Sequence, residues 1–386
     1  MNDLATMSED AQNVVVMHMG SERFCYGLAQ GGIDGCKVER SLVGRPRATA
    51  HVIPFSHSQY IGNRAWASRH ILTPSFPINK GYPGTDYEIL LRHGYLESDP
   101  FNGEPLPLLL TEPYQLSREL KEKECEFAFE ELKVPLFGLS PSAELVMHAQ
   151  GLQSGVVVDI GLSSTRIIPV LHRSIVKEAV NELEVGGEHI TRNLIKCLSM
   201  RAGWSLTGSQ ALFEEIDDMK KVVCYVAKNL EHEVEIAEAT PKAIEAIWAA
   251  PTSQQHTVGA PRFWAPEVLF NPSCIDLDAI GIDQLITNSV HRTPKSALVA
   301  SHIILSGGSS LLPGLATRIE SNLQQDLNSK KVDVEIAEAK EAPAAWIGAA
   351  KLAQDFALFN SIAITKAQYE EQGPSSIHAR PSSLPH

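Results

Sequence analysis

One short pattern occurs twice in this chain, and it constrains the fold more than any other feature. A run of three valines leads into a Gly-containing tight turn at VVVMHMGS, from residue 14, and again at VVVDIGLSS, from residue 156. Short β-branched runs of this kind are typical of strands buried on both faces. Two such turns facing across a cleft could hold phosphate groups through backbone N–H groups, so the repeat suggests a nucleotide cleft.

Strands and helices alternate along the rest of the sequence. Apolar runs that stop at Gly or polar residues predict further strands at 107–112, 164–172 and 301–308. Helices are predicted at 117–132, 142–150, 187–200, 209–230, 312–328 and 344–360. The alternation favours an α/β architecture. A length of 386 residues predicts two core-bearing units, and the Pro- and Ser-rich tail at 373–386 is expected to be extended or loosely held.

Composition excludes several classes of protein. The formal charge is −13, with 46 acidic and 33 basic residues, which argues against broad nucleic-acid binding but leaves room for a small basic patch. No apolar run is long enough to span a bilayer, and the acidic N-terminus is unlike a targeting signal. We therefore expect that the protein does not bind membranes and that it is located in the cytosol, the nucleus or a cytoskeletal assembly. Six cysteines without a CxxC pair favour reduced thiols.

Many segments, in order, resemble actin and the actin-related proteins. The matching pieces are SLVGRPR (41–47), YIGNRA (60–65), RHILTPSFPINKG (69–81), LLLTEP (108–113), VVVDIG (156–161), LEVGGEHITRNL (183–194), KKVVCYVA (220–227), RFWAPEVLFNPS (262–273), ILSGGSSLLPGLATRI (304–319), AWIGAAKLA (345–353) and KAQYEEQGPSSIH (366–378). The resemblance implies an α/β, actin-like two-lobed fold of the actin, hexokinase and Hsp70 type, with four subdomains around a nucleotide cleft.

The resemblance also implies where the lobes lie. The outer lobe would comprise 1–149 plus 345–386, with subdomain 2 at about 41–75. The inner lobe would comprise 150–344, with subdomain 4 at about 188–275.

The first turn departs from the family pattern, which is Asp-x-Gly-Ser-Gly with a Lys three residues further on. Gly20 and Ser21 match its Gly-Ser, whereas His18 stands at the Asp, Glu22 at the last Gly and Cys25 at the Lys. A neutral imidazole replaces a hard oxygen ligand poorly. The second change adds a negative charge beside an anion, and the third removes a positive one. Each change opposes nucleotide binding.

The second turn is half retained. Asp159 and Gly161 match its Asp-x-Gly, but Leu162 and Ser163 replace the Asp and Gly that follow. Asp159 could bind a metal ion through a water molecule, or it could cap the turn. Ser142 stands where the family has the glutamine that positions the attacking water, and its side chain is too short for that role.

Positions on the adenine side are better retained. The resemblance implies cofactor contacts at Gly187, Lys220, Gly307 and Gly308. Lys220 would contact the base and ribose, although Lys221 replaces the family's ribose-binding Glu. Glycines and a lysine beside the core can also be required by the fold alone, so a purely structural role for these residues is the alternative. Taken with the turns, the pattern predicts that ATP or ADP with Mg binds weakly or not at all.

Two surfaces that make filaments in the family are changed. The subdomain 2 loop corresponds to ATAHVIPFSHSQ (48–59), which lacks the family's Gly-rich character. The groove that receives partner helices keeps Ile347 and Leu352 but gains Lys351, Asp355 and His148. Charge at such a groove selects different ligands.

No other catalytic motif is found: GxxxxGK[ST], HExxH and GxSxG are all missing, and the 14 histidines show no metal-ligand spacing. We therefore expect no ATPase activity. The leading hypothesis is a divergent actin-related protein that is a structural, non-polymerising subunit of a cytoskeletal, ciliary or chromatin-associated complex. Its partners would be other subunits, including actin or actin-related proteins. The alternatives are a filament-forming ATP-binding protein with slow or absent hydrolysis, and a nucleotide-sensing switch.

Overall fold

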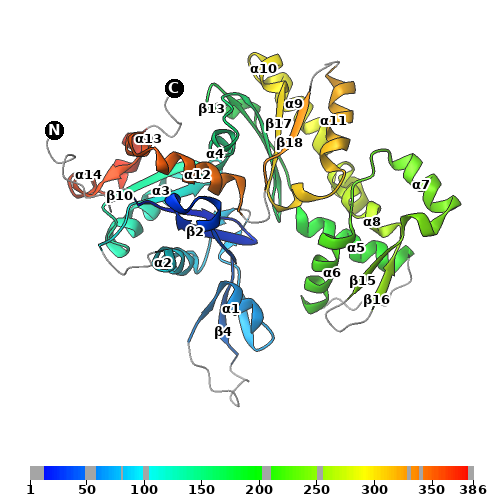
Figure 1. Ribbon diagram of the computed structural model, residues 1–386, viewed down its shortest axis with the longest axis horizontal. Coiled ribbons are helices and arrows are strands. Elements are labelled where there is room, and N and C mark those ends of the chain that lie inside the picture. Colours follow the sequence, from blue (N-terminus) through cyan, green and yellow to red (C-terminus); the bar gives the residue numbers. More distant parts are fainter. Residues whose placement is uncertain are drawn as a thin grey trace. The chain divides into compact units, whose positions relative to one another are not determined.

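The structure is a computed structural model, and its chain divides into two compact units (Figure 1). It describes residues 13–47, 58–79, 81–98, 104–201, 210–249, 255–327, 332–338 and 342–380. Unit 1 comprises Met1–Gln153, Val170–Ile175 and Ala339–His386, and unit 2 comprises Ser154–Pro169 and Val176–Glu338. Every helix within the described ranges is too short or too polar to cross a bilayer.

Unit 1 is built on a six-stranded mixed sheet. In spatial order its strands are β19 (Ile364–Thr365), β10 (Leu136–Pro141), β9 (Leu108–Glu112), β1 (Val15–Met19), β2 (Arg23–Leu28) and β3 (Lys37–Arg40). β9 runs parallel to both β1 and β10, whereas β2 and β3 continue from β1 as antiparallel neighbours. The first valine run is therefore an inner strand.

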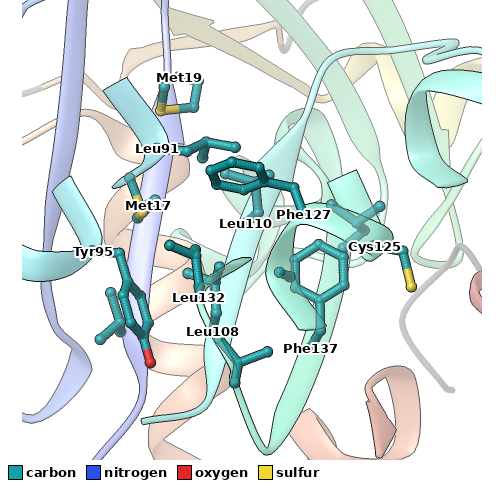
Figure 2. Packing of buried hydrophobic residues seen from close by; sticks show 14 of the residues in the cluster. Met17, Met19, Leu91, Tyr95, Leu108, Leu110, Cys125, Phe127, Leu132 and Phe137 are labelled. Atoms are coloured by element: carbon teal, nitrogen blue, oxygen red, sulfur yellow. The ribbon is translucent and has the colours of Figure 1, made fainter. Parts of the chain in front are cut away.

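Both faces of this sheet are covered around β1 and β9, which explains the apolar runs 14–17 and 108–110. Val15 and Met17 pack in one core cluster with Leu110 (Figure 2), while Val14 and Val16 pack in another on the opposite face. The first cluster includes side chains of α2 (Tyr87–Ser98), α3 (Arg118–Glu126) and the π-helical turn Phe127–Glu131. The second is covered by α12 (Ala344–Gln354), whose Trp346 Nε1 donates to the Val16 carbonyl at 3.1 Å.

The C-terminal part of unit 1 differs from the prediction in two places. The helix predicted at 344–360 is two helices, α12 and α13 (Phe356–Ile362), because the Asp355 side chain caps a new start by accepting from Leu358 N at 3.1 Å. After α14 (Lys366–Gln372), the expected loose tail is wrong for 374–379, which form a 3-10 helix with Ile377 buried. The last six residues lie outside the described ranges.

A small module within unit 1 comprises residues 42–47 and 58–75 of the described chain. It consists of β4 (Val43–Pro46), β5 (Tyr60–Ile61), β6 (Leu72–Ser75) and α1 (Gly62–Ala67). Strand β4 pairs with both β5 and β6. Its core is small, made of Leu42, Ala65 and Leu72. The predicted filament loop falls mostly on 48–57, outside the described residues. The remaining elements of unit 1 are a 3-10 segment (Ala29–Gly35), β7 (Ile78–Asn79), β8 (Tyr82–Pro83), α4 (Ser142–Ala149) and β13 (Ser174–Ile175).

Unit 2 also contains a mixed sheet. Its strands follow the order β12 (Thr165–Leu171), β11 (Gly155–Ile160), β17 (His302–Ser306) and β18 (Asp333–Ile336), with β14 (Asn181–Leu183) also on β12. β17 runs parallel to both β11 and β18. Its helices are α5 (Gly187–Arg201), α6 (Gln210–Val223), α7 (Leu230–Ala239), α8 (Pro261–Trp264), α9 (Ile282–Arg292), α10 (Ser296–Ala300) and α11 (Leu315–Asp326).

The predicted helix 209–230 is too long, because α6 ends at Val223. The next residues bond to distant segments instead: Tyr225 N donates to Arg262 O, and Val226 N donates to Pro313 O. A new helix, α7, starts where the Asn229 side chain accepts from His232 N at 3.0 Å. A short hairpin, β15 (Ala246–Ala249) with β16 (Gln255–Val258), follows it.

Candidate functional site: two glycine turns and a buried lysine

The first candidate turn connects β1 to β2 in unit 1. Gly20 N donates to Arg23 O at 3.0 Å, and a Cβ at Gly20 would lie 2.7 Å from that same oxygen, so the hairpin requires glycine there. Ser41 Oγ donates to Gly20 O at 2.5 Å, and Ser21 Oγ accepts from Gly81 N at 2.9 Å. The two residues that match the family motif thus have polar groups engaged within unit 1.

His18 lies where the family has its metal-organising Asp. Its Nδ1 is 2.8 Å from Thr111 Oγ1 on the neighbouring strand β9. Burial, reinforced by the charge of Arg23, lowers the pKa of His18 to about 4. The imidazole is therefore neutral at pH 7 and supplies neither a hard oxygen ligand nor a positive charge.

The other two substituted positions of this turn, Glu22 and Cys25, differ in their surroundings. The Glu22 carboxylate lies 3.7 Å from Arg40 Nη1, so its charge is partly balanced by this arginine at the end of β3. Cys25 is fully buried in the core cluster that contains Val14 and Val16. The position that carries a phosphate-binding lysine in the family is here part of a hydrophobic core.

The second candidate turn follows β11 in unit 2 and packs against the start of α5. Gly161 N donates to Ser164 O at 3.0 Å, and Gly187 N donates to Gly161 O at 2.9 Å. Burial raises the pKa of Asp159, and the charge of Arg166 opposes that shift. The structure therefore brings Gly161 and Gly187 together, with the half-buried carboxyl of Asp159 near the end of the strand.

Gly307 packs directly on this turn. Its φ is +82°, and a Cβ there would lie 2.6 Å from Ile160 O and 2.7 Å from Asp159 Oδ1. Its N–H donates to Glu338 Oε2 at 3.3 Å. Gly308 begins a 3-10 turn, Gly308–Leu311. Both conformation and close approach require glycine at 307, independently of any ligand.

Lys220 is buried, and its amine is held by three acceptors within unit 2. Nζ donates to Gly187 O at 2.9 Å, to Thr191 Oγ1 at 2.9 Å and to Asp217 Oδ1 at 2.5 Å. An ammonium group has three N–H donors, so this arrangement uses all of them. Lys221 Nζ lies 2.7 Å from the other oxygen, Asp217 Oδ2.

Asp217 and Thr191 are residues that sequence reasoning missed. Burial acts to raise the pKa of Asp217, but the positive charges of Lys220 and Lys221 and their hydrogen bonds outweigh it and lower the pKa to about 2. The signal in the sequence was the spacing, because Asp217 precedes the two lysines by three and four residues on one helix. No comparable spacing in the sequence identified Thr191, the acceptor on α5.

Ser142 is the first residue of α4, directly after Pro141. Its Oγ donates to Glu112 O at 3.0 Å, at the end of β9. The hydroxyl hydrogen is therefore committed to a backbone carbonyl within unit 1.

The sequence profile described as actin matches residues 9–382. The chain belongs to the actin family. The α/β fold with two mixed sheets is accordingly the actin fold, as the sequence predicts. Actin-family proteins generally bind ATP or ADP with Mg.

Curated relatives add a level of detail. The chain is 33% identical over 393 residues to actin-related protein 2 of Saccharomyces cerevisiae, covering 95% of this chain and 98% of that protein. It is 29% identical over 384 residues to actin-related protein 2 of Acanthamoeba castellanii, with the same coverage of both chains. This family member is thus an actin-related protein.

Proposed function

We propose that this actin-related protein is a structural, non-polymerising subunit of a larger multiprotein complex and that its glycine turns do not support ATP hydrolysis. The observation that carries the proposal is the state of Lys220, whose three N–H donors are all engaged by Gly187, Thr191 and Asp217. A ribose hydroxyl would have to displace one of these acceptors. Displacing the carboxylate weakens a buried ion pair, which opposes nucleotide binding.

The first turn supports the same proposal on electrostatic grounds. Phosphate groups need nearby cations or aligned N–H donors. The turn presents a neutral imidazole at His18 and a carboxylate at Glu22, and the former lysine position, Cys25, is buried in the core. The residues present do not fit an ATP–metal complex in the way that the family motif does, and we derive no hydrolytic step from them.

Ser142 bears on the chemical step rather than on binding. Its hydroxyl hydrogen is donated to the Glu112 carbonyl, and the side chain is shorter than the glutamine of the family. Nothing at this position replaces the residue that orients a water molecule. A protein without that residue would act through its surfaces rather than through turnover.

Similarity to an actin-related protein along nearly the whole chain supports membership of a complex. The partners we propose are other subunits, including actin or actin-related proteins. We expect the complex in the cytoplasm or cytoskeleton, with the nucleus as the alternative place and cilia as one cytoskeletal setting. The charged residues Lys351 and Asp355 on α12 and its C-cap favour partners other than the usual groove ligands of the family.

Nucleotide content of the purified chain tests the proposal. We expect denatured protein to release far less than one ATP or ADP per chain, and titration calorimetry with ATP and Mg²⁺ to give at most weak binding. Phosphate release should match a protein-free control, and ultracentrifugation under polymerising salt should leave the chain in the supernatant.

Each contrary result points to a specific alternative. Stoichiometric bound ATP without filaments would favour the nucleotide-sensing switch. Stoichiometric ATP together with sedimentable filaments would overturn the proposal in favour of an ATP-binding filament subunit. Mild purification from the source cell, followed by identification of co-purified chains, tests complex membership separately.

A further inference from the structure

Strand β3 and the small module that follows it carry a concentration of positive charge. Residues 37–70 contain six Lys and Arg side chains and one carboxylate, Glu39, whereas the chain as a whole has a formal charge of −13. Arg45 is neutralised by a bidentate pair with Asp86, in which both N–O distances are 2.7 Å. The remaining arginines form what we call the Arg–Trp surface: Arg40, Arg47, Arg64 and Arg69 with Trp66. Of these, Arg40 is partly balanced by Glu22, whose carboxylate lies 3.7 Å from Arg40 Nη1.

Arg40 and Arg69 both contact the Trp66 ring, and Arg64 lies on the same helix as Trp66, α1. The guanidinium groups of Arg40 and Arg69 lie 3.6 Å and 4.3 Å from the centroid of the Trp66 ring. Arg40 N donates to Asn63 Oδ1 at 3.3 Å, which places β3 beside α1. Strand β4 pairs with β6 and ends at Pro46, which lies opposite Leu72. Arg47 is the next residue after this strand.

Three of the guanidinium groups, those of Arg40, Arg47 and Arg69, are held in place before any partner arrives. Arg47 Nε donates to Leu72 O at 2.8 Å, and Arg69 Nη1 donates to Trp66 O at 2.9 Å. Arg47 and Arg64 are nevertheless exposed. An arginine fixed by stacking or by one hydrogen bond loses less side-chain entropy when its other N–H groups bind a carboxylate.

We propose that the Arg–Trp surface binds an acidic segment of a partner protein. Guanidinium groups recognise carboxylates through paired N–H···O bonds, and several of them on one surface fit a run of Asp or Glu. This inference does not depend on the proposed function, because it holds whether or not the glycine turns bind nucleotide.

Nucleic acid fits this surface less well. Proteins that bind single strands stack bases on exposed aromatic rings. Here the Trp66 ring is already contacted by the guanidinium groups of Arg40 and Arg69. A long polyanion would also meet the acidic remainder of the chain, whereas a short acidic peptide segment would not.

Fluorescence anisotropy with a labelled peptide of alternating Glu and Gly tests the proposal. We expect salt-sensitive binding to the full chain and none by the matched Gln and Gly peptide. The double variant Arg47→Glu with Arg64→Glu should weaken binding at least about tenfold. The control is Arg118→Glu, an exposed arginine at the start of α3, which should change affinity less than about twofold.

Four results would overturn the proposal. They are failure of the Glu peptide to bind, equal binding of the Gln peptide, an equal loss in the control variant, and tighter binding of a single-stranded oligonucleotide of the same charge. The double variant changes exposed side chains only, so its circular dichroism and melting temperature should match those of the unchanged protein and exclude misfolding.

Discussion

The two glycine turns have departed from the family pattern in different ways. In the first, groups are missing: His18 and Cys25 stand where the Asp and Lys belong. Beside the second, the lysine of the adenine side is retained as Lys220 on α6, but Asp217 and its neighbours bind its amine inside unit 2. Retention of a residue type therefore does not establish retention of its role, since the role depends on which groups compete for its donors.

The largest effect should come from breaking the internal ion pair of unit 2. Asp217→Ala leaves the buried Lys220 amine without its carboxylate, and we expect a loss of about 3 kcal/mol in the free energy of unfolding, measured in urea. Asp218→Ala is the matched control, because Asp218 is 52% exposed and 3.5 Å from Lys221. The control should cost less than about 0.5 kcal/mol. Equal losses would mean that Lys220 is not held as described.

The first turn should show its own signature in the pH dependence of stability. The pKa of His18 is about 4 in the folded protein against an ordinary value of 6.5. Between pH ~6.5 and ~4 the His18 imidazole is protonated in the unfolded chain but stays neutral in the folded chain. The free energy of unfolding therefore falls as the pH drops through this range. The loss over that range should be about 2.5 kcal/mol.

His18→Gln tests this assignment, because an amide does not titrate in the range. Urea unfolding at several pH values should show a flatter profile than that of the unchanged protein. His70→Gln, at an exposed position, is the control and should leave the profile unchanged. A profile that stays steep in His18→Gln would assign the titration to other groups.

Adding a Cβ at Gly307 tests whether geometry alone requires the glycine that packs on the second turn. Gly307→Ala places a Cβ 2.6 Å from Ile160 O at a φ of +82°. We expect a loss of about 2 kcal/mol in the free energy of unfolding, without any nucleotide present. Gly31→Ala is the control, since a Cβ there meets nothing within 4 Å. A neutral result at Gly307 would favour a ligand-binding reason for that glycine.

The smallest expected effect is a gain of function in the first turn. The double variant His18→Asp with Glu22→Gly restores two motif positions and leaves the buried Cys25 in place. ATP affinity with Mg²⁺ should rise by about tenfold, or about 1.4 kcal/mol, in titration calorimetry. Unchanged affinity would count against the alignment of this turn.

Much of the fold could be predicted because its signals are local. The valine runs predicted β1 and β11. The helix predicted from residue 117 begins there as α3, where Ser117 Oγ accepts from Leu120 N at 3.2 Å. The errors occurred where a capping residue or a distant segment decides the outcome. Asp355 divides one predicted helix, and the Pro313 carbonyl pairs with Val226 N beyond the end of α6.

Less of the candidate site could be predicted from the sequence. The glycines could be identified because a turn needs them regardless of surroundings, as Gly20 and Gly307 illustrate. The state of Lys220 could not, because its acceptors Gly187 and Thr191 belong to another helix. Burial of Cys25 likewise depends on α12, which lies far along the chain.

The hydrogen bond from Trp346 to the Val16 carbonyl has a consequence for synthesis on the ribosome. One face of β1 is covered by α12, so it stays uncovered while the residues of unit 2 are translated. At typical elongation rates that interval lasts on the order of ten to forty seconds. Unit 2 has time to fold in that interval. The first strands of unit 1, in contrast, expose an apolar face to solvent and to chaperones until the C-terminal helices have been synthesised.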